Sequence, residues 1–322
     1  KSLGDLQQSL DIIENHIANS SNPNPILFLQ KALILWDMQK YDEASKILSD
    51  LSEKYPNQDR IQYMSALAQE KIKNYDKAIA AYSSIPKQSM FWIHAQFRLS
   101  IIVGEQKKYN EALEIIYAIE PEPAVMWEIY FVGANLLGEQ KKYKEAIDFL
   151  TKGYKRFNDK HTLLFLIGVY QEKLNLRKES IETMKKLVEL DATNSTALNF
   201  LGYMYAEDGI NLDEAENLIK KALTLKPNDA YYLDSLGWVY YQKKDFKKAL
   251  EYLLKAIEIE PNEGVILEHL ADVYVVFKEY NKAKEHYEKA LKTKLEERDQ
   301  IRIEKKYQTF LNLKFKHIND GK

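Results

Sequence analysis

The 322-residue chain contains no cysteine. This absence excludes disulfide bonds, catalysis by a thiolate and any metal centre held by cysteine ligands. It leaves the compartment open, because a chain without cysteine is compatible with oxidising and reducing surroundings alike. Long apolar runs are absent too: the longest, such as Leu163–Tyr170, are far shorter than the roughly 20 residues of a membrane-spanning helix. We therefore expect no direct insertion of this chain into a membrane.

The sequence also lacks a strong excess of charge of either sign. Its formal net charge is −2, although 29% of its residues are charged. Proteins that bind nucleic acid or an anionic membrane surface through their overall field carry a clear basic excess. Neither partner is therefore expected here.

Known chemical motifs are missing as well. The sequence has no phosphate-binding loop, dinucleotide-binding turn, zinc-protease motif, nucleophile elbow or calcium loop, and its six histidines are scattered. Asp234, Glu268 and Asp272 come closest to an acidic catalytic group, but carboxylates are common on the surfaces of helical repeats and no activating pocket is implied. The sequence predicts no enzymatic activity, no cofactor and no bound metal.

What the chain does contain is a repeated unit, seen most clearly in Ala230–Glu263. Apolar residues at helical spacing on both sides of a polar break at 242–245 predict two amphipathic helices joined by a tight turn. Gly237 and Ala249 are small enough for helices that cross closely, and Pro261 ends the second helix. A hairpin of this size cannot bury its own apolar face, so it needs copies stacked beside it.

Those copies follow at intervals of 34 residues. The turn-and-helix motif reads KYDEA at 40–44, NYDKA at 74–78, KYNEA at 108–112, KYKEA at 142–146 and, in degraded form, LRKES at 176–180. One extra residue lies within the turn at 207–211, and the interval of 34 then resumes. We predict eight repeats over residues 25–297, beginning at 25, 59, 93, 127, 161, 195, 230 and 264.

The two ends are predicted to cap this array. Residues 1–24 contain an amphipathic helix, interpreted as an N-terminal capping helix or half repeat, and 298–322 are interpreted as a C-terminal capping helix and tail. The basic cluster Arg298, Arg302, Lys305 and Lys306 is accompanied by neighbouring acids. We interpret it as a solvated face of the cap, with a docking surface for an acidic partner as the alternative.

The repeat pattern resembles the tetratricopeptide repeat, TPR: a small residue at position 8, an aromatic near 17, alanine at 20, a small residue at 27 and proline near 32. The resemblance covers most of the chain. It implies an all-α fold, a right-handed α-solenoid superhelix of eight tandem helical hairpins with capping helices at both ends. Departures are local: Arg177 replaces the turn aromatic, Leu187 replaces the small residue at position 27, and proline is missing at Met90, Asn158, Ala192 and Leu295.

The same resemblance places positions 2, 5, 9 and 12 of each first helix on the concave side. Position 5 carries large apolar residues in the first five repeats, here called the position-5 ladder: Leu29, Tyr63, Phe97, Phe131 and Phe165. Two interpretations stay open. The rings line a binding groove, since contiguous exposed apolar surface usually marks a binding site, or they pack against the adjacent first helix and tighten the array.

From the sixth repeat onward the concave positions become polar and aromatic, a composition typical of recognition surfaces. A ligand carrying Lys or Arg beside an apolar anchor would suit them, because cations gain from both carboxylates and ring faces. The Lys–Asn pair with which chaperone-binding TPR domains hold a terminal carboxylate occurs in no repeat. The predicted ligand-binding groove consists of Tyr63, Phe97, Phe131, Phe165, Asn199, Tyr203, Tyr231, Asp234, Trp238, Tyr241, Glu268 and Asp272.

A finer resemblance lies within Leu198–Leu291, where LNFLGYMYAEDGINLDEAENLIKKAL, DSLGWVYY and EHLADVY follow one another. This succession is similar to bacterial envelope TPR proteins, often lipoproteins, among them adaptors of a carboxyl-terminal processing protease. It implies a periplasmic location with a lipid-anchor cysteine upstream of Lys1; a cytoplasmic location is the alternative.

Two functions stay open at this point. The first is a non-catalytic scaffold that binds a protein or peptide in its groove, in the envelope, and delivers substrates to a protease or an assembly machine. The second is a structural, oligomerising subunit of a larger assembly, with the ladder and end helices buried against other copies. The sequence does not set the oligomeric state.

Overall fold

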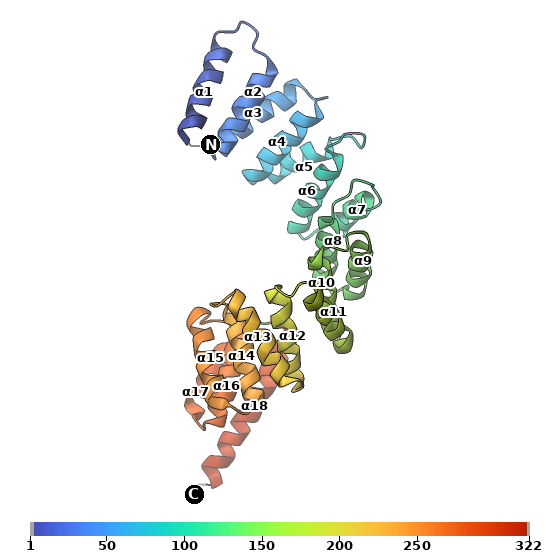
Figure 1. Cartoon of the computed structure of the whole chain (residues 1–322). Coiled ribbons are helices and arrows are strands. Elements are labelled where there is room, and N and C mark those ends of the chain that lie inside the picture. Colours follow the sequence, from blue (N-terminus) through green and yellow to red (C-terminus); the bar gives the residue numbers. More distant parts are fainter. Residues whose placement is uncertain (1–2, 321–322) are drawn as a thin grey trace. The chain divides into compact units, whose positions relative to one another are not determined.

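The computed structural model describes the backbone of residues 3–320 and the side chains of residues 3–312. Within that range the chain forms helices and no strand, so the predicted all-α fold of helical hairpins is confirmed (Figure 1). The chain divides into two compact units, 1–163 and 164–322.

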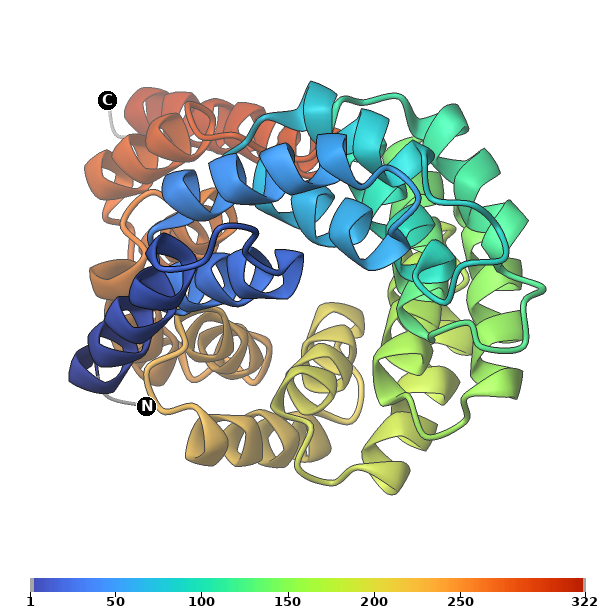
Figure 2. The same ribbon diagram turned by 90° about the horizontal axis from the view of Figure 1, so that it is seen from above.

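The N-terminal unit is a series of antiparallel hairpins preceded by a single helix. Each second helix packs against the first helix of its own hairpin and of the next, so that successive hairpins lie side by side (Figures 1 and 2). The first helix, α1, is held against α2 by the buried residues Leu6 and Leu10. The helices are α1 (Leu3–Ala18), α2 (Pro25–Asp37), α3 (Tyr41–Lys54), α4 (Asp59–Lys71), α5 (Tyr75–Ser83), α6 (Trp92–Glu105), α7 (Tyr109–Ile119), α8 (Glu128–Glu139) and α9 (Tyr143–Arg156).

The C-terminal unit repeats the same arrangement and ends in a longer helix. The boundary between the units falls within α10, which continues into the second one. The helices are α10 (His161–Lys173), α11 (Arg177–Leu190), α12 (Ser195–Asp208), α13 (Leu212–Leu225), α14 (Ala230–Gln242), α15 (Phe246–Ile259), α16 (Gly264–Val276), α17 (Tyr280–Ala290) and α18 (Glu297–Asp320).

Close packing inside each hairpin depends on the small residues of the repeat. Position 20 of every repeat is fully buried. At position 8, a Cβ atom added at Gly237 would lie 2.8 Å from Leu253 Cγ. At Gly202 the corresponding distance, to Ile219 Cγ1, is 2.6 Å. Larger side chains would therefore force the two helices of a hairpin apart. The residues at position 20 are Ala44, Ala78, Ala112, Ala146, Ser180, Ala215, Ala249 and Ala283.

Each turn between the two helices of a hairpin contains one residue in the left-handed backbone region, always at position 15. This conformation ends the first helix by placing the next N–H groups over its last carbonyls. The φ angles lie between 58° and 65° at Gln39, Lys73, Lys107, Lys141, Asn175, Gly209, Lys244 and Lys278. Only Gly209 adopts this angle without a Cβ penalty. The sixth turn, which holds the extra residue, has a second left-handed residue, Asn211 (φ 47°).

The last helix, α18, packs on α16 and α17. Its residues Ile303 and Phe310 are buried, and the Phe310 ring lies 5.7 Å from the ring of Tyr287 on α17. Residue 298 stands 34 positions after the start of α16, so α18 occupies the sequence register of a ninth first helix. This register determines which of its side chains meet the wall of the preceding repeats.

Candidate functional site

In the N-terminal unit the position-5 ladder is half-buried. Tyr63 stacks on Phe91, with ring centroids 5.3 Å apart and planes 20° apart, and Phe131 makes an edge contact with Trp127 at 6.4 Å. Phe97 is also of intermediate exposure. Tyr63 and Phe131 thus pack against other rings, and all three rings keep part of their surface outside the core, so their role as a groove stays a prediction. The fourth ring, Phe165 in the C-terminal unit, contacts Phe200 edge-on at 5.8 Å.

The C-terminal unit brings the polar and aromatic candidates together on adjoining first helices. Because α12 contacts α14 and α14 contacts α16, positions 5 and 9 of three successive repeats form one wall. Position 5 supplies Asn199, Asp234 and Glu268, and position 9 supplies Tyr203, Trp238 and Asp272.

A buried histidine that the sequence did not single out lies at the centre of this wall. His269 Nδ1 is 2.8 Å from Asp234 Oδ1, and its ring stacks on Trp238 with centroids 4.1 Å and planes 15° apart. Tyr241 also stacks on Trp238, with ring centroids 4.6 Å and planes 6° apart. The rings of His269, Trp238 and Tyr241 therefore form one contiguous group, and the Asp234 carboxylate is hydrogen-bonded to its histidine.

Helix α18 already supplies the cations that this wall attracts. The Arg302 guanidinium donates to Glu268 through Nε (2.9 Å) and Nη2 (2.6 Å). Lys306 Nζ lies 2.6 Å from Asp272 Oδ2 and 2.8 Å from Glu268 Oε1, and 5.2 Å from the Trp238 ring centroid. The expected chemistry, a cation held by carboxylates and a ring, is thus present, but the ligand is the chain's own helix.

Two sequence interpretations are corrected by this contact. Glu268, Asp272 and Trp238 are buried, so in this structure they are not an open binding surface. Asp234 is buried as well, but it also borders a cavity. The basic cluster of α18 is not merely a solvated face either, because Arg302 and Lys306 point at the acids of α16. Both ion pairs join residues 34 positions apart, so adding one more interval to Glu268 and Asp272 would have found them.

The buried charges stabilise one another. Burial alone would raise the pKa of Glu268, but hydrogen bonding from Arg302 and the nearby charges of His269 and Lys306 lower it to about 2. Burial alone would lower the pKa of His269, yet Asp234 and Glu268 raise it above its usual value. The pKa of Lys306 is also raised, because Asp272 and Glu268 outweigh its burial. Arg302 and Glu268 therefore form an ionised pair at neutral pH.

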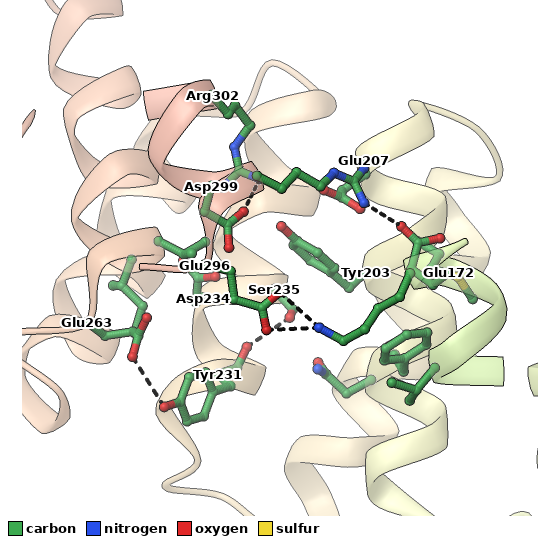
Figure 3. A pocket seen from close by; sticks show the side chains of 18 of the residues that line it. Glu172, Tyr203, Glu207, Tyr231, Asp234, Ser235, Glu263, Glu296, Asp299 and Arg302 are labelled. Carbon is green, nitrogen blue, oxygen red and sulfur yellow. Dashed lines mark hydrogen bonds and ion pairs between the residues drawn. The ribbon is translucent and has the colours of Figure 1, made fainter. Parts of the chain in front are cut away.

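Beside this occupied wall lies a cavity of about 350 Å³, formed by α10, α12, α14, α16 and the beginning of α18 (Figure 3). It gathers four of the predicted site residues, Asn199, Tyr203, Tyr231 and Asp234. Its rim is closed by two ion pairs that join α10 to residues at the start of α18: Lys173–Glu296 at 2.9 Å and Arg298–Glu172 at 3.2 Å.

No group of three or more histidine, aspartate or glutamate side chains among the described residues is arranged to hold a metal ion. In the same range, no helix combines the length and the apolar composition needed to cross a bilayer.

Comparison with known families identifies the family of this chain. The family model described as Tetratricopeptide repeat matches residues 134–307, more than half of the chain. The chain belongs to the tetratricopeptide repeat family. A second TPR model matches residues 29–91, in the N-terminal unit.

Individual relatives share the TPR fold but differ in sequence. The TPR repeat-containing protein PA4667 of Pseudomonas aeruginosa is 32% identical over 104 residues, which is 32% of this chain and only 18% of that protein. A TPR protein from Parabacteroides merdae matches with a TM-score of 0.58 at 15% identity, covering 85% of this chain and 99% of that one. A chain of the APC/C hetero-tetramer Cut9-Hcn1 matches with a TM-score of 0.59 at 17% identity, covering 95% and 59%.

Proposed function

We propose that this TPR protein is a non-catalytic scaffold whose N-terminal unit binds a segment of another protein along the position-5 ladder. The observation that carries the proposal is the half-burial of Tyr63, Phe97 and Phe131, at intervals of 34 residues on successive first helices. Rings that keep part of their surface outside the core can contribute binding energy at little cost in rotamer entropy. TPR proteins in general bind proteins or peptides, which agrees with this use.

The cellular setting of the proposal is the bacterial envelope. The segment Leu198–Leu291 resembles envelope TPR proteins, and this resemblance supports a periplasmic adaptor, held by an upstream lipid anchor, that delivers substrates to a carboxyl-terminal processing protease. Capture of partners from a native envelope fraction, followed by mass spectrometry, tests this setting. Recovery of partners from the cytoplasmic fraction alone would contradict it.

The alternative, a self-assembling structural subunit, makes a different prediction for the isolated protein. Its ladder would be buried against other copies, so the mass measured by light scattering would rise with protein concentration. A monomer at all concentrations would exclude that alternative and leave the scaffold.

The decisive variant is Phe131→Ala, matched with Phe149→Ala on α9. Phe149 is buried and lies 4.9 Å from the Tyr130 ring, so its truncation should cost about 3–5 kcal/mol of stability. Phe131→Ala should cost much less stability and weaken partner binding by about an order of magnitude. Denaturant titration and affinity measured with a captured partner separate the two effects. If Phe131→Ala unfolds as easily as Phe149→Ala while the folded fraction binds normally, the ladder is packing.

A further inference from the structure

The cavity of the C-terminal unit has more anionic than cationic groups in its wall. Six carboxylates and four cationic groups line it. Every one of these cations already has a carboxylate partner, at distances between 2.6 and 3.2 Å, in the pairs Lys173–Glu296, Arg298–Glu172, Arg177–Glu207 and Arg302–Glu268. The unbalanced charge that is left in the wall is therefore negative.

Two lining carboxylates have no partner among the lysines and arginines that the structure describes. Glu263 accepts a hydrogen bond from the Tyr231 hydroxyl at 3.3 Å, and Asp234, only 5% exposed, is paired through Oδ1 with His269. Asn199 adds a side-chain carbonyl oxygen that is buried and has no hydrogen-bond partner within the described residues. The lining of the cavity thus offers more hydrogen-bond acceptors than donors.

Aromatic side chains flank these acceptors. Figure 3 shows Tyr203 and Tyr231, from α12 and α14, around the same space as Asp234 and Glu263. Tyr231 keeps 53% of its surface exposed, so its ring is available to a ligand. Ring faces beside carboxylates form the environment in which organic cations are bound most favourably.

The wall formed by α14 and α16, next to the cavity, already binds cations in such an environment. One repeat further on, Glu268 and Asp272 bind Arg302 and Lys306, and Lys306 lies over the ring of Trp238. The cavity presents the equivalent positions of the preceding repeats, Asp234 and Tyr203, where Asp234 is paired with His269 and not with a lysine or arginine. Its volume of about 350 Å³ fits a side-chain-sized ligand, at the lower end of the roughly 300–1,000 Å³ of small-ligand pockets.

We propose that this cavity binds an organic cation: a guanidinium or alkylammonium group on an aliphatic stem. Glu263 balances its charge, Asp234, which shares its own charge with His269, adds a hydrogen-bond acceptor, and the rings of Tyr203 and Tyr231 contact the cation and its stem. The cation is either an arginine or lysine side chain of a partner segment or a free small molecule of the same chemistry. The site lies outside the N-terminal ladder and does not depend on ligand binding there.

Isothermal titration calorimetry of the whole chain at low salt tests the site with three probes. These are the capped tripeptide acetyl-Gly-Arg-Gly-amide, the same peptide with citrulline, which keeps the shape of arginine without its charge, and agmatine. We expect the arginine peptide to bind and the citrulline peptide to bind about tenfold more weakly or less. Agmatine binding as tightly as the peptide identifies a free small cation as the source; tighter peptide binding identifies a partner side chain. Both results support the site.

Matched variants locate the binding. Glu263→Gln removes the charge and keeps the hydrogen bond from Tyr231, whereas Glu260→Gln removes an exposed charge nearby that does not line the cavity. We expect Glu263→Gln to weaken the arginine peptide severalfold, and Glu260→Gln and Phe131→Ala to leave its affinity unchanged, with native circular dichroism in all three. Equal affinity for the arginine and citrulline peptides, no heat from either cationic probe, or an unchanged Glu263→Gln affinity would each overturn the proposal.

Discussion

The N-terminal unit and the last repeats of the C-terminal unit use the same repeat position in opposite ways. Position 5 of the N-terminal unit carries half-buried rings such as Phe97 and Phe131, whereas in the last repeats it carries the buried acids Asp234 and Glu268. The backbone is the same helical hairpin in both cases. What differs is the partner that each side chain meets: the acids of α16 meet cations on α18, whereas Tyr63 and Phe131 meet the rings of Phe91 and Trp127. The chemistry of each wall therefore depends on the residue type at this position and on its partner.

The rings and the carboxylates also differ in the free energy that their burial costs. Apolar rings that pack on neighbours can be exposed or covered at modest cost, but a buried carboxylate is tolerable only while its cations stay in place. The C-terminal wall is thus a fixed structure that includes α18, whereas the rings of the N-terminal ladder keep part of their surface outside the core. Breaking the fixed structure should produce the larger changes.

The largest effect is expected for Glu268→Ala. Glu268 is fully buried, and its loss leaves Arg302 and Lys306 without their main partner. Breaking such a pair costs about 3–5 kcal/mol, with the lower value favoured because both cations keep about a third of their surface in solvent. Urea unfolding measures the loss. Glu258→Ala, at an exposed position of α15, is the control; equal stabilities of the two variants would mean that these ion pairs do not hold α18.

A smaller loss, similar in both units, is expected from overpacking at position 20. Ala249→Leu in the C-terminal unit and Ala112→Leu in the N-terminal unit enlarge fully buried positions where helices cross, at a cost of about 1–3 kcal/mol each. In an array of repeats the damage should stay near the altered hairpin. Hydrogen exchange locates it. Loss of protection throughout both units for either variant would contradict this local behaviour.

The hairpins could be predicted from the sequence, but the contacts of α18 with distant helices could not. The hairpins follow from local features, because helical periodicity, small residues and the interval of 34 all lie within one or two repeats. The partners of Glu268 were missed, although the interval reaches Arg302, because α18 has lost the small and aromatic residues that identify a repeat. The cavity could not be predicted, since the pairs Lys173–Glu296 and Arg298–Glu172 join residues more than 120 positions apart.

A pH dependence of intermediate size is expected from the C-terminal wall. The folded pKa of His269 is raised above 6.5, so its stabilising contribution is complete below pH 6.5 and is lost as pH rises through the folded value. Each unit of elevation is worth about 1.4 kcal/mol. Glu268, with a pKa lowered to about 2, loses its contribution only as pH falls toward 2, and Lys306, whose pKa is raised above 10.5, keeps its own below pH 10.

Between pH 6 and 9, His269 is therefore the member of this cluster that changes charge. The denaturant midpoint of the C-terminal unit should fall over that range, and His269→Gln should flatten the dependence. His94→Gln, at an exposed position of the N-terminal unit, should leave it intact. A fall of the same size in His269→Gln as in the unaltered protein would assign the pH dependence to other groups.

The smallest effect is expected at the rim of the cavity. Glu296 keeps 71% of its side-chain surface in solvent, so its ion pair with Lys173 should contribute only about 0.2–1 kcal/mol and should weaken with added salt. Glu296→Gln should therefore leave the global unfolding midpoint nearly unchanged while increasing hydrogen exchange at the start of α18, most clearly at low salt. Glu182→Gln, which removes the exposed pair with Lys185 on α11, is the matched control and should affect neither. If the start of α18 exchanges equally in both variants at low salt, this ion pair does not restrain the rim, and the position of α18 depends on the buried contacts of Glu268 and Asp272.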